Sequence, residues 1–196
     1  MHEGALSWSD RREVEIQKYR EVYRDHEYPT PDGRCESVME WLGLRASTAS
    51  TYLDVGCGRG KMLFAAIEAF GFDARGCDVV EDVCRHAPGI DLIEGAHHLP
   101  YATDQFDVVT TTDMLEHLIE EDVHPALSEM RRVCRGPVLL GVCHAQDVPF
   151  KFGQERLHMT VKPHDWWKEA IRLATGETPQ VYRNEPRGSW YELGVS

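Results

Sequence analysis

The chain has 196 residues, 42% of them hydrophobic and 28% charged, which is ordinary for one globular domain with a buried core. Its formal net charge of −12 disfavours general binding to the phosphates of nucleic acids. The amino-terminal residues lack the basic start and apolar core of a signal peptide, and no apolar run has the length of a membrane helix. None of the six cysteines is in a C-x-x-C pair or at zinc spacing with a histidine. We therefore expect a cytoplasmic protein with free thiols and no metal ion.

The first fifty residues indicate two helices. The stretch from Asp10 to about His26 is amphipathic but weakly apolar, and prolines follow it. The second helix is expected from about Cys35 to Leu42. We divide the chain into an amino-terminal helical segment, residues 1–48, and a domain over residues 49–196.

From Thr51 onward, short apolar strands alternate with helices. Strands are expected at 51–55, 73–78, 90–94, 106–112 and 137–143. Helices are expected at 61–70, 80–86 and 121–134, and the tail is expected to form a helix from about 165 to 176 and a hairpin of residues 180–185 and 189–195. This order predicts an α/β, Rossmann-like fold: a seven-stranded, mainly parallel sheet with an antiparallel carboxyl-terminal strand and helices on both faces.

The most informative stretch is LDVGCGRG, in which a strand containing Asp54 runs into Gly56, Gly58 and Gly60 and then into a helix. Glycine permits a tight turn and the close approach of a ligand to the backbone. The next strand ends at Asp78, where a carboxylate beside the turn can accept both hydroxyl groups of a ribose. The third glycine stands one residue too early for a dinucleotide fingerprint, which disfavours a nucleotide-linked oxidoreductase or epimerase.

From about residue 50 to its end, the chain resembles the class I S-adenosylmethionine-dependent methyltransferases. The resemblance is carried by LDVGCGRG, by GCDVVEDV at the second strand, by EGAHHLPYATDQFDVVTTTDMLEHL through the fourth strand, and by RRVCRGPVLLGV before the fifth. It implies that the protein is an enzyme that uses S-adenosylmethionine and releases S-adenosylhomocysteine. In many relatives a segment such as residues 1–48 folds over the cofactor as a lid. For Tyr19 in this segment we expect only packing of the helix onto the domain.

The resemblance also implies which residues bind the cofactor: Asp54, Gly56, Cys57, Gly58, Gly60, Asp78, Val79, Ala96 and His97. Asp54 and the turn would hold the methionine end and Asp78 the ribose, while the later residues would surround the adenine. Gly95 stands where many relatives have an aspartate that reads the adenine amino group. Adenine recognition here would therefore rest on backbone groups or on His97.

Methyl transfer is a direct displacement, so the protein must align the acceptor and exclude water, and a base is needed only for a protonated nucleophile. Asp113, after the fourth strand, is the first candidate for contact with the acceptor, and capping of its turn is an equal alternative. His144, after the fifth strand, is a candidate base, although a lone histidine is more often a structural hydrogen-bonding group. Glu116 and His117 are expected to shape a loop.

The chemical class of the methyl acceptor is restricted mainly by sequence motifs that the chain lacks. Thr111-Thr112-Asp113-Met114 replaces the D/N-P-P-[YF] motif of amino-methylating DNA enzymes. We expect a small-molecule or metabolite acceptor with an oxygen or nitrogen nucleophile, and neither nucleic acid nor membrane as a partner. The competing hypothesis is a non-catalytic S-adenosylmethionine-binding module, such as a regulatory subunit. The sequence leaves open a monomer or a homodimer.

Overall fold

The computed structural model describes residues 7–24, 32–46, 48–146 and 156–195. Its strands form one seven-stranded sheet in the order β3-β2-β1-β4-β5-β7-β6. The strands are β1 (Thr51–Val55), β2 (Asp73–Asp78), β3 (Ile90–Leu92), β4 (Val108–Thr112), β5 (Val138–Cys143), β6 (Gln180–Glu185) and β7 (Gly188–Leu193). Among these strands only β7 runs against its neighbours. The predicted fold class is confirmed.

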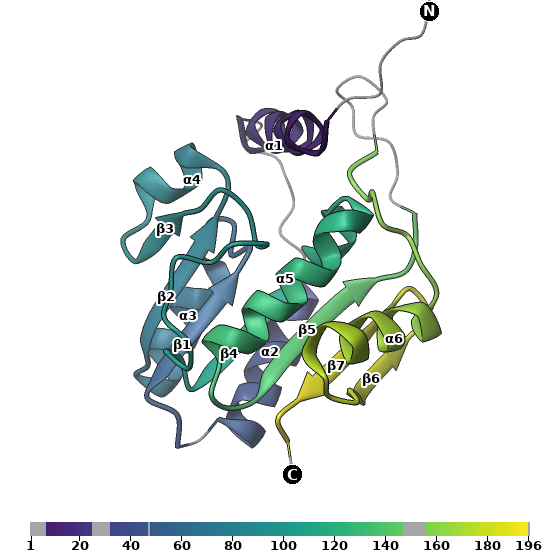
Figure 1. Cartoon of the computed structure of the whole chain (residues 1–196). Helices are drawn as coiled ribbons and strands as arrows, with labels where there is room; N and C mark the ends of the chain where they lie inside the picture. Colours follow the sequence, from purple (N-terminus) through teal and green to yellow (C-terminus); the bar gives the residue numbers. More distant parts are fainter. Residues whose placement is uncertain (1–6, 25–31, 47, 147–155, 196) are drawn as a thin grey trace, which may run out of the picture.

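Helices cover both faces of the sheet (Figure 1). α5 (Glu120–Val133) and α6 (His164–Thr175) pack on one face, and α2 (Asp32–Arg45) and α3 (Lys61–Phe70) pack on the other. Successive strand residues point to opposite faces, so Leu53 joins the core beneath α5 and α6 while Tyr52 joins the core beneath α2 and α3. None of the helices in the described ranges is long and apolar enough to cross a bilayer.

Some predicted element boundaries shift by one or two residues. The third strand ends at Leu92 instead of Glu94, and the chain then turns toward the cavity described below. The fourth strand begins at Val108, because Phe106 makes only an isolated bridge to Cys134. The fifth begins one residue after Pro137, which has no N–H group to donate to a sheet ladder.

The two amino-terminal helices have different environments. In α2, Val38, Trp41 and Leu42 are completely buried in the core. The indole Nε1–H of Trp41 also donates to the carboxylate of Glu192 on β7 at 2.9 Å. In α1 (Trp8–Arg24), Val22 is the only buried hydrophobic residue among the described side chains. The segment 1–48 therefore contains one helix of the domain core and one peripheral helix.

Candidate functional site

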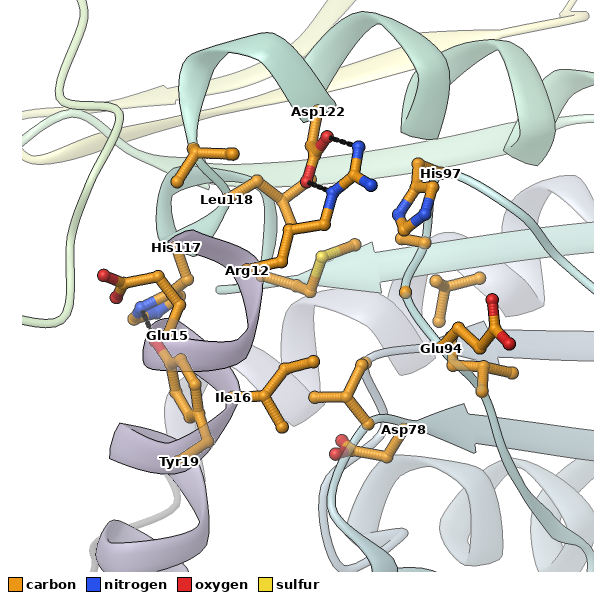
Figure 2. A pocket seen from close by; sticks show the side chains of 18 of the residues that line it. Arg12, Glu15, Ile16, Tyr19, Asp78, Glu94, His97, His117, Leu118 and Asp122 are labelled. Carbon is orange, nitrogen blue, oxygen red and sulfur yellow. Dashed lines mark hydrogen bonds and ion pairs between the residues drawn. The ribbon is translucent and has the colours of Figure 1, made fainter. Parts of the chain in front are cut away.

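A cavity lies between α1 and the carboxyl ends of the central parallel strands (Figure 2). It holds about 860 Å³ of space, including the part open to solvent. α1 contributes Arg12, Glu15, Ile16, Tyr19 and Tyr23 to its wall. The opposite wall comes from the strand ends and the loops after them, as expected for an open α/β sheet.

The glycine-rich turn reaches this opposite wall through Gly56, whereas Cys57, Gly58 and Gly60 are not among the described residues that line the cavity. Gly56, Gly58 and Gly60 have φ angles of 72°, 52° and 77°, in the left-handed region that residues with a side chain rarely adopt. The N–H groups of Gly56 and Cys57 both donate to the carbonyl of Cys77 at the end of β2, at 2.9 and 3.2 Å. A Cβ atom on Gly58 would lie 2.6 Å from the Tyr23 hydroxyl oxygen. The turn is thus bound to β2 and closely approached by α1.

Asp78 connects the glycine turn to the cavity. Its carboxylate accepts the N–H of Gly58 at 2.9 Å and that of Val80 at 3.0 Å, and the residue lines the cavity. Burial raises the pKa of Asp78, while the two N–H donors act in the opposite direction. The acid at the end of the second strand therefore lies beside the glycine turn.

Asp54 lies deeper than the turn and does not line the cavity. It is 3% exposed, and its carboxylate accepts a hydrogen bond from the Thr110 hydroxyl at 3.3 Å. Burial raises its pKa to about 7, and the negative charge of Asp78 adds to the increase. The sequence groups Asp54 with the glycines, whereas the structure places it in the buried strand below them.

The residues expected around the adenine also reach the cavity. Val79, Ala96 and His97 line it. Burial lowers the pKa of His97, and the nearby Arg12 cation lowers it further. A Cβ atom on Gly95 would lie 2.5 Å from Nδ1 of His97. A side chain at position 95 would displace this imidazole, which gives a physical reason for glycine where many relatives have aspartate.

Asp113 reaches the cavity from the end of β4. Its φ of 51° is unusual for a residue with a side chain, and such strain is often found at functional sites. Its carboxylate forms a salt bridge with Arg34 of α2. Burial raises the pKa of Asp113, and the Arg34 cation opposes this. Asp113 is thus a carboxylate oriented by a cation at the cavity wall.

Comparisons with known proteins agree with this geometry. Residues 53–138 match the family model of a methyltransferase domain. Over these residues the chain is similar to class I S-adenosylmethionine-dependent methyltransferases. A similar solved structure is the 1,6-didemethyltoxoflavin-N1-methyltransferase of Burkholderia thailandensis, with bound 1,6-didemethyltoxoflavin and S-adenosylhomocysteine. It has a TM-score of 0.74 and 16% identity, over 97% of this chain and 91% of that one.

Two further structures share this fold. The PH0226 protein of Pyrococcus horikoshii OT3 has a TM-score of 0.65 and 17% identity, over 84% of this chain and 90% of that one. The [4+2]-cyclase SpnF has a TM-score of 0.58 and 17% identity, over 75% of this chain and 57% of that one. No curated protein sequence matches the chain. At these identities the likeness establishes the fold.

Two residues singled out from the sequence, His144 and Tyr19, have other surroundings than expected. His144 is not among the described residues that line the cavity; its backbone N–H donates to the carbonyl of Arg187 at 2.7 Å, and its Nε2 lies 3.5 Å from the Tyr191 hydroxyl. The structure therefore does not bring His144 and Asp113 to one site. Tyr19, in contrast, was expected only to pack, but it lines the cavity and its hydroxyl contacts Nδ1 of His117.

Sequence reasoning missed a cluster next to Asp113. Glu116, His117 and His158 each offer a ligand atom within 4.8 Å of the others. Burial raises the pKa of Glu116 well above its usual range, and Asp113 adds to this. Burial alone would lower the pKa of His158, but contacts with Cys143, Ala145 and Glu116 raise it to about 9. The backbone carbonyl of Glu116 also accepts the N–H groups of residues 159 and 160, so it shapes the loop as expected.

Proposed function

We propose that the chain binds S-adenosylmethionine in the cavity beneath α1 and transfers its methyl group to a small-molecule or metabolite acceptor. The observation that carries this proposal is the junction of Asp78 with the glycine turn at the cavity wall. The acceptor atom is an oxygen or a nitrogen, and the products are the methylated acceptor and S-adenosylhomocysteine.

The residues around the junction fit the donors and charges of this cofactor. Each carboxylate oxygen of Asp78 accepts one N–H and has a second lone pair, so the carboxylate can also accept the two ribose hydroxyls. Gly56 brings backbone without a side chain to the cavity wall, and Cys57, Gly58 and Gly60 continue the turn that holds it there. Asp54, below the turn, adds negative charge near the methionine end, where the cofactor carries an amino group and a sulfonium.

Other side chains of the protein would surround the adenine, exclude water and contact the acceptor. Val79, Ala96 and His97 surround the adenine, and α1 covers the cavity and excludes water. When bound, the cofactor supplies an activated methyl group. Asp113 accepts a hydrogen bond or a proton from the acceptor, while Arg34 keeps its carboxylate oriented. His144 is assigned no step, because it does not line the cavity.

Calorimetric titration tests the cofactor assignment. We expect S-adenosylmethionine and S-adenosylhomocysteine to bind with micromolar affinity and NAD not to bind. Asp78→Asn should weaken binding of both by about 1–1.5 kcal/mol for each ribose hydroxyl, because a charge-assisted hydrogen bond becomes a neutral one. Asp73→Asn, an exposed position on the same strand, is the matched control and should bind like wild type. Unchanged affinity in a folded Asp78→Asn protein would overturn the placement of the cofactor.

Catalysis needs a separate measurement. Release of S-adenosylhomocysteine is followed while candidate hydroxyl- and amine-bearing metabolites are screened as acceptors. Turnover with any of them, lost in Asp113→Asn, supports the enzyme and the role of Asp113. Tight cofactor binding without turnover on the panel would instead favour the non-catalytic module.

A further inference from the structure

The cluster of Glu116, His117 and His158 combines ligand types that bind transition metals. Glu116 and His117 belong to the short helix η1 (Leu115–His117) after β4, and His158 lies in the segment before α6. One carboxylate oxygen and one ring nitrogen from each histidine lie within 4.8 Å of one another. Imidazole favours zinc, iron, nickel and copper, and two histidines with one glutamate are a known set of zinc ligands.

Glu116 provides a second and independent observation. The residue is completely buried, and its Oε1 accepts the N–H of Cys143 at 3.1 Å. Its Oε2 is also buried and accepts no hydrogen bond within the described residues, and the side chain that approaches this carboxyl group is the Asp113 carboxylate, which is itself an acceptor. A buried carboxylate oxygen without a partner is costly. Coordination of a cation at Oε2 would remove that cost.

The two imidazole rings are oriented as metal ligands usually are. Nδ1 of His117 lies 3.1 Å from the carbonyl oxygen of Leu157, and Nδ1 of His158 lies 2.7 Å from that of Ala145. The Ala145 carbonyl oxygen only accepts hydrogen bonds, so Nδ1 of His158 carries a proton and Nε2 can act as a ligand when the ring is neutral. Nδ1 of His117 is shared between the Leu157 carbonyl and the Tyr19 hydroxyl. Such a hydrogen bond from the second ring nitrogen to a backbone carbonyl is typical of metal-binding histidines.

From these contacts we infer that Glu116, His117 and His158 bind one divalent transition-metal ion, of which Zn²⁺ is the reference case. A tetrahedral ion with bonds of about 2.0–2.2 Å holds its ligand atoms about 3.4 Å apart, so small side-chain rotations complete the geometry. His117 and Asp113 also line the cavity, so the fourth coordination position lies toward the cavity side. The site does not depend on the proposed methyl transfer.

An ion pair offers a metal-free account of the same residues. A protonated His158 beside an ionised Glu116 would balance the buried charge without any ion. The two accounts differ in a measurable way, because the ion pair predicts no stoichiometric metal binding. The expectation from the sequence that no metal is bound would then hold.

The test uses the full chain after dialysis against a chelator. Zn²⁺ is titrated calorimetrically, Co²⁺ is followed by its visible d–d absorption, and Mg²⁺ serves as the hard-cation control. Glu116→Gln and His158→Gln keep the side-chain shape while removing or weakening a ligand. His124→Gln, an exposed position on α5, is the matched control. Thermal melting in the presence of chelator shows whether each variant is folded.

We expect one Zn²⁺ per chain, Mg²⁺ weaker than Zn²⁺, and a Co²⁺ spectrum of nitrogen and oxygen ligands. Glu116→Gln and His158→Gln should lower the Zn²⁺ affinity by about 10- to 100-fold or more, while His124→Gln leaves it unchanged. Absence of stoichiometric Zn²⁺ binding, equal affinity in folded Glu116→Gln and wild-type proteins, or an intense thiolate-to-cobalt band would each overturn the site.

Discussion

The floor and the cover of the cavity are held in place by different kinds of interaction. The floor, which consists of the glycine turn and Asp78 with Asp54 buried beneath them, is held by hydrogen bonds to the end of β2 and by the core below it. The cover, which is α1, buries only Val22 completely among its described hydrophobic side chains. Removing or straining a floor residue should therefore affect the whole domain.

The cover is attached by pairs of side chains. Arg12 forms a bidentate ion pair with Asp122 of α5, and Arg11 pairs with Glu121 at 2.6 Å (Figure 2 shows the first pair). The Arg59 guanidinium donates to the backbone carbonyl of Tyr23 at 2.8 Å. The exposed Arg11–Glu121 pair contributes only about 0–1 kcal/mol, and the partly buried Arg12–Asp122 pair contributes about 1.5–3 kcal/mol. The cover can therefore open at a smaller free-energy cost than unfolding of the floor, as access to an enclosed site requires.

The largest pH-dependent effect is expected below the glycine turn, in Asp54→Asn. The pKa of Asp54 rises from 3.8 when unfolded to about 7 when folded, so between these values the folded protein binds more protons. The wild type therefore loses stability as the pH rises through this window, by about 4 kcal/mol in total. Asparagine removes this loss. Urea unfolding at about pH 5 and about pH 8 should show the variant gaining about 2–3 kcal/mol relative to wild type at the higher pH.

If the difference in free energy of unfolding between the two proteins did not change with pH, this would contradict a buried Asp54 carboxylate with a raised pKa. The same variant should bind S-adenosylmethionine more weakly than wild type, because negative charge near the methionine end is lost. A gain in stability together with a loss of affinity would show that Asp54 is retained for binding at the expense of folding.

Gly58→Val tests where the floor meets the cover. Its φ of 52° is unfavourable for a β-branched residue, and its Cβ would displace the Tyr23 hydroxyl. We expect a loss of about 3 kcal/mol in the free energy of unfolding. Gly71→Val is the matched control, because Gly71 has φ 70° and no atom within 4 Å of its Cβ position. Urea denaturation should show a loss of about 1–2 kcal/mol in the free energy of unfolding for this control. Equal losses in the two variants would mean that Tyr23 does not approach the turn.

Arg12→Gln tests the cover alone. Loss of the charge-assisted bonds to Asp122 should lower the opening free energy of α1 by about 1.5–3 kcal/mol. Hydrogen exchange followed by mass spectrometry should show faster exchange in residues 8–24 and unchanged exchange in α2. Arg11→Gln, which breaks a more exposed pair, should have the smallest effect, about 0–1 kcal/mol. Equal acceleration in α1 and α2 would contradict a cover that opens independently.

Much of the floor could be predicted from short stretches of sequence. A buried strand, a glycine turn and a helix follow one another within LDVGCGRG, and the next strand ends at Asp78. Each of these signals is local, since positive φ demands glycine and parallel strands bring their carboxyl ends to one edge. The burial of Asp54 below the turn, with its raised pKa, required the packing of neighbouring strands.

The candidate catalytic residues show the limit of that reasoning. Asp113 and His144 both follow central strands, and position after a strand was the only criterion available. The structure places Asp113 at the cavity and ties His144 to the β6–β7 turn, because β5 lies next to the antiparallel strand β7. No periodicity in the sequence signals which strand end faces the ligand.

The sequence by itself determined the α/β alternation, the glycine turn and the acid that joins it, because each depends on backbone conformation and burial within a few adjacent residues. Only the tertiary structure decided that α2 belongs to the core while α1 covers the cavity, that Arg34 orients Asp113, and that Glu116 and His117 meet His158. These contacts join residues far apart in the chain. They depend on how whole elements pack, and spacing along the sequence carries no signal for that.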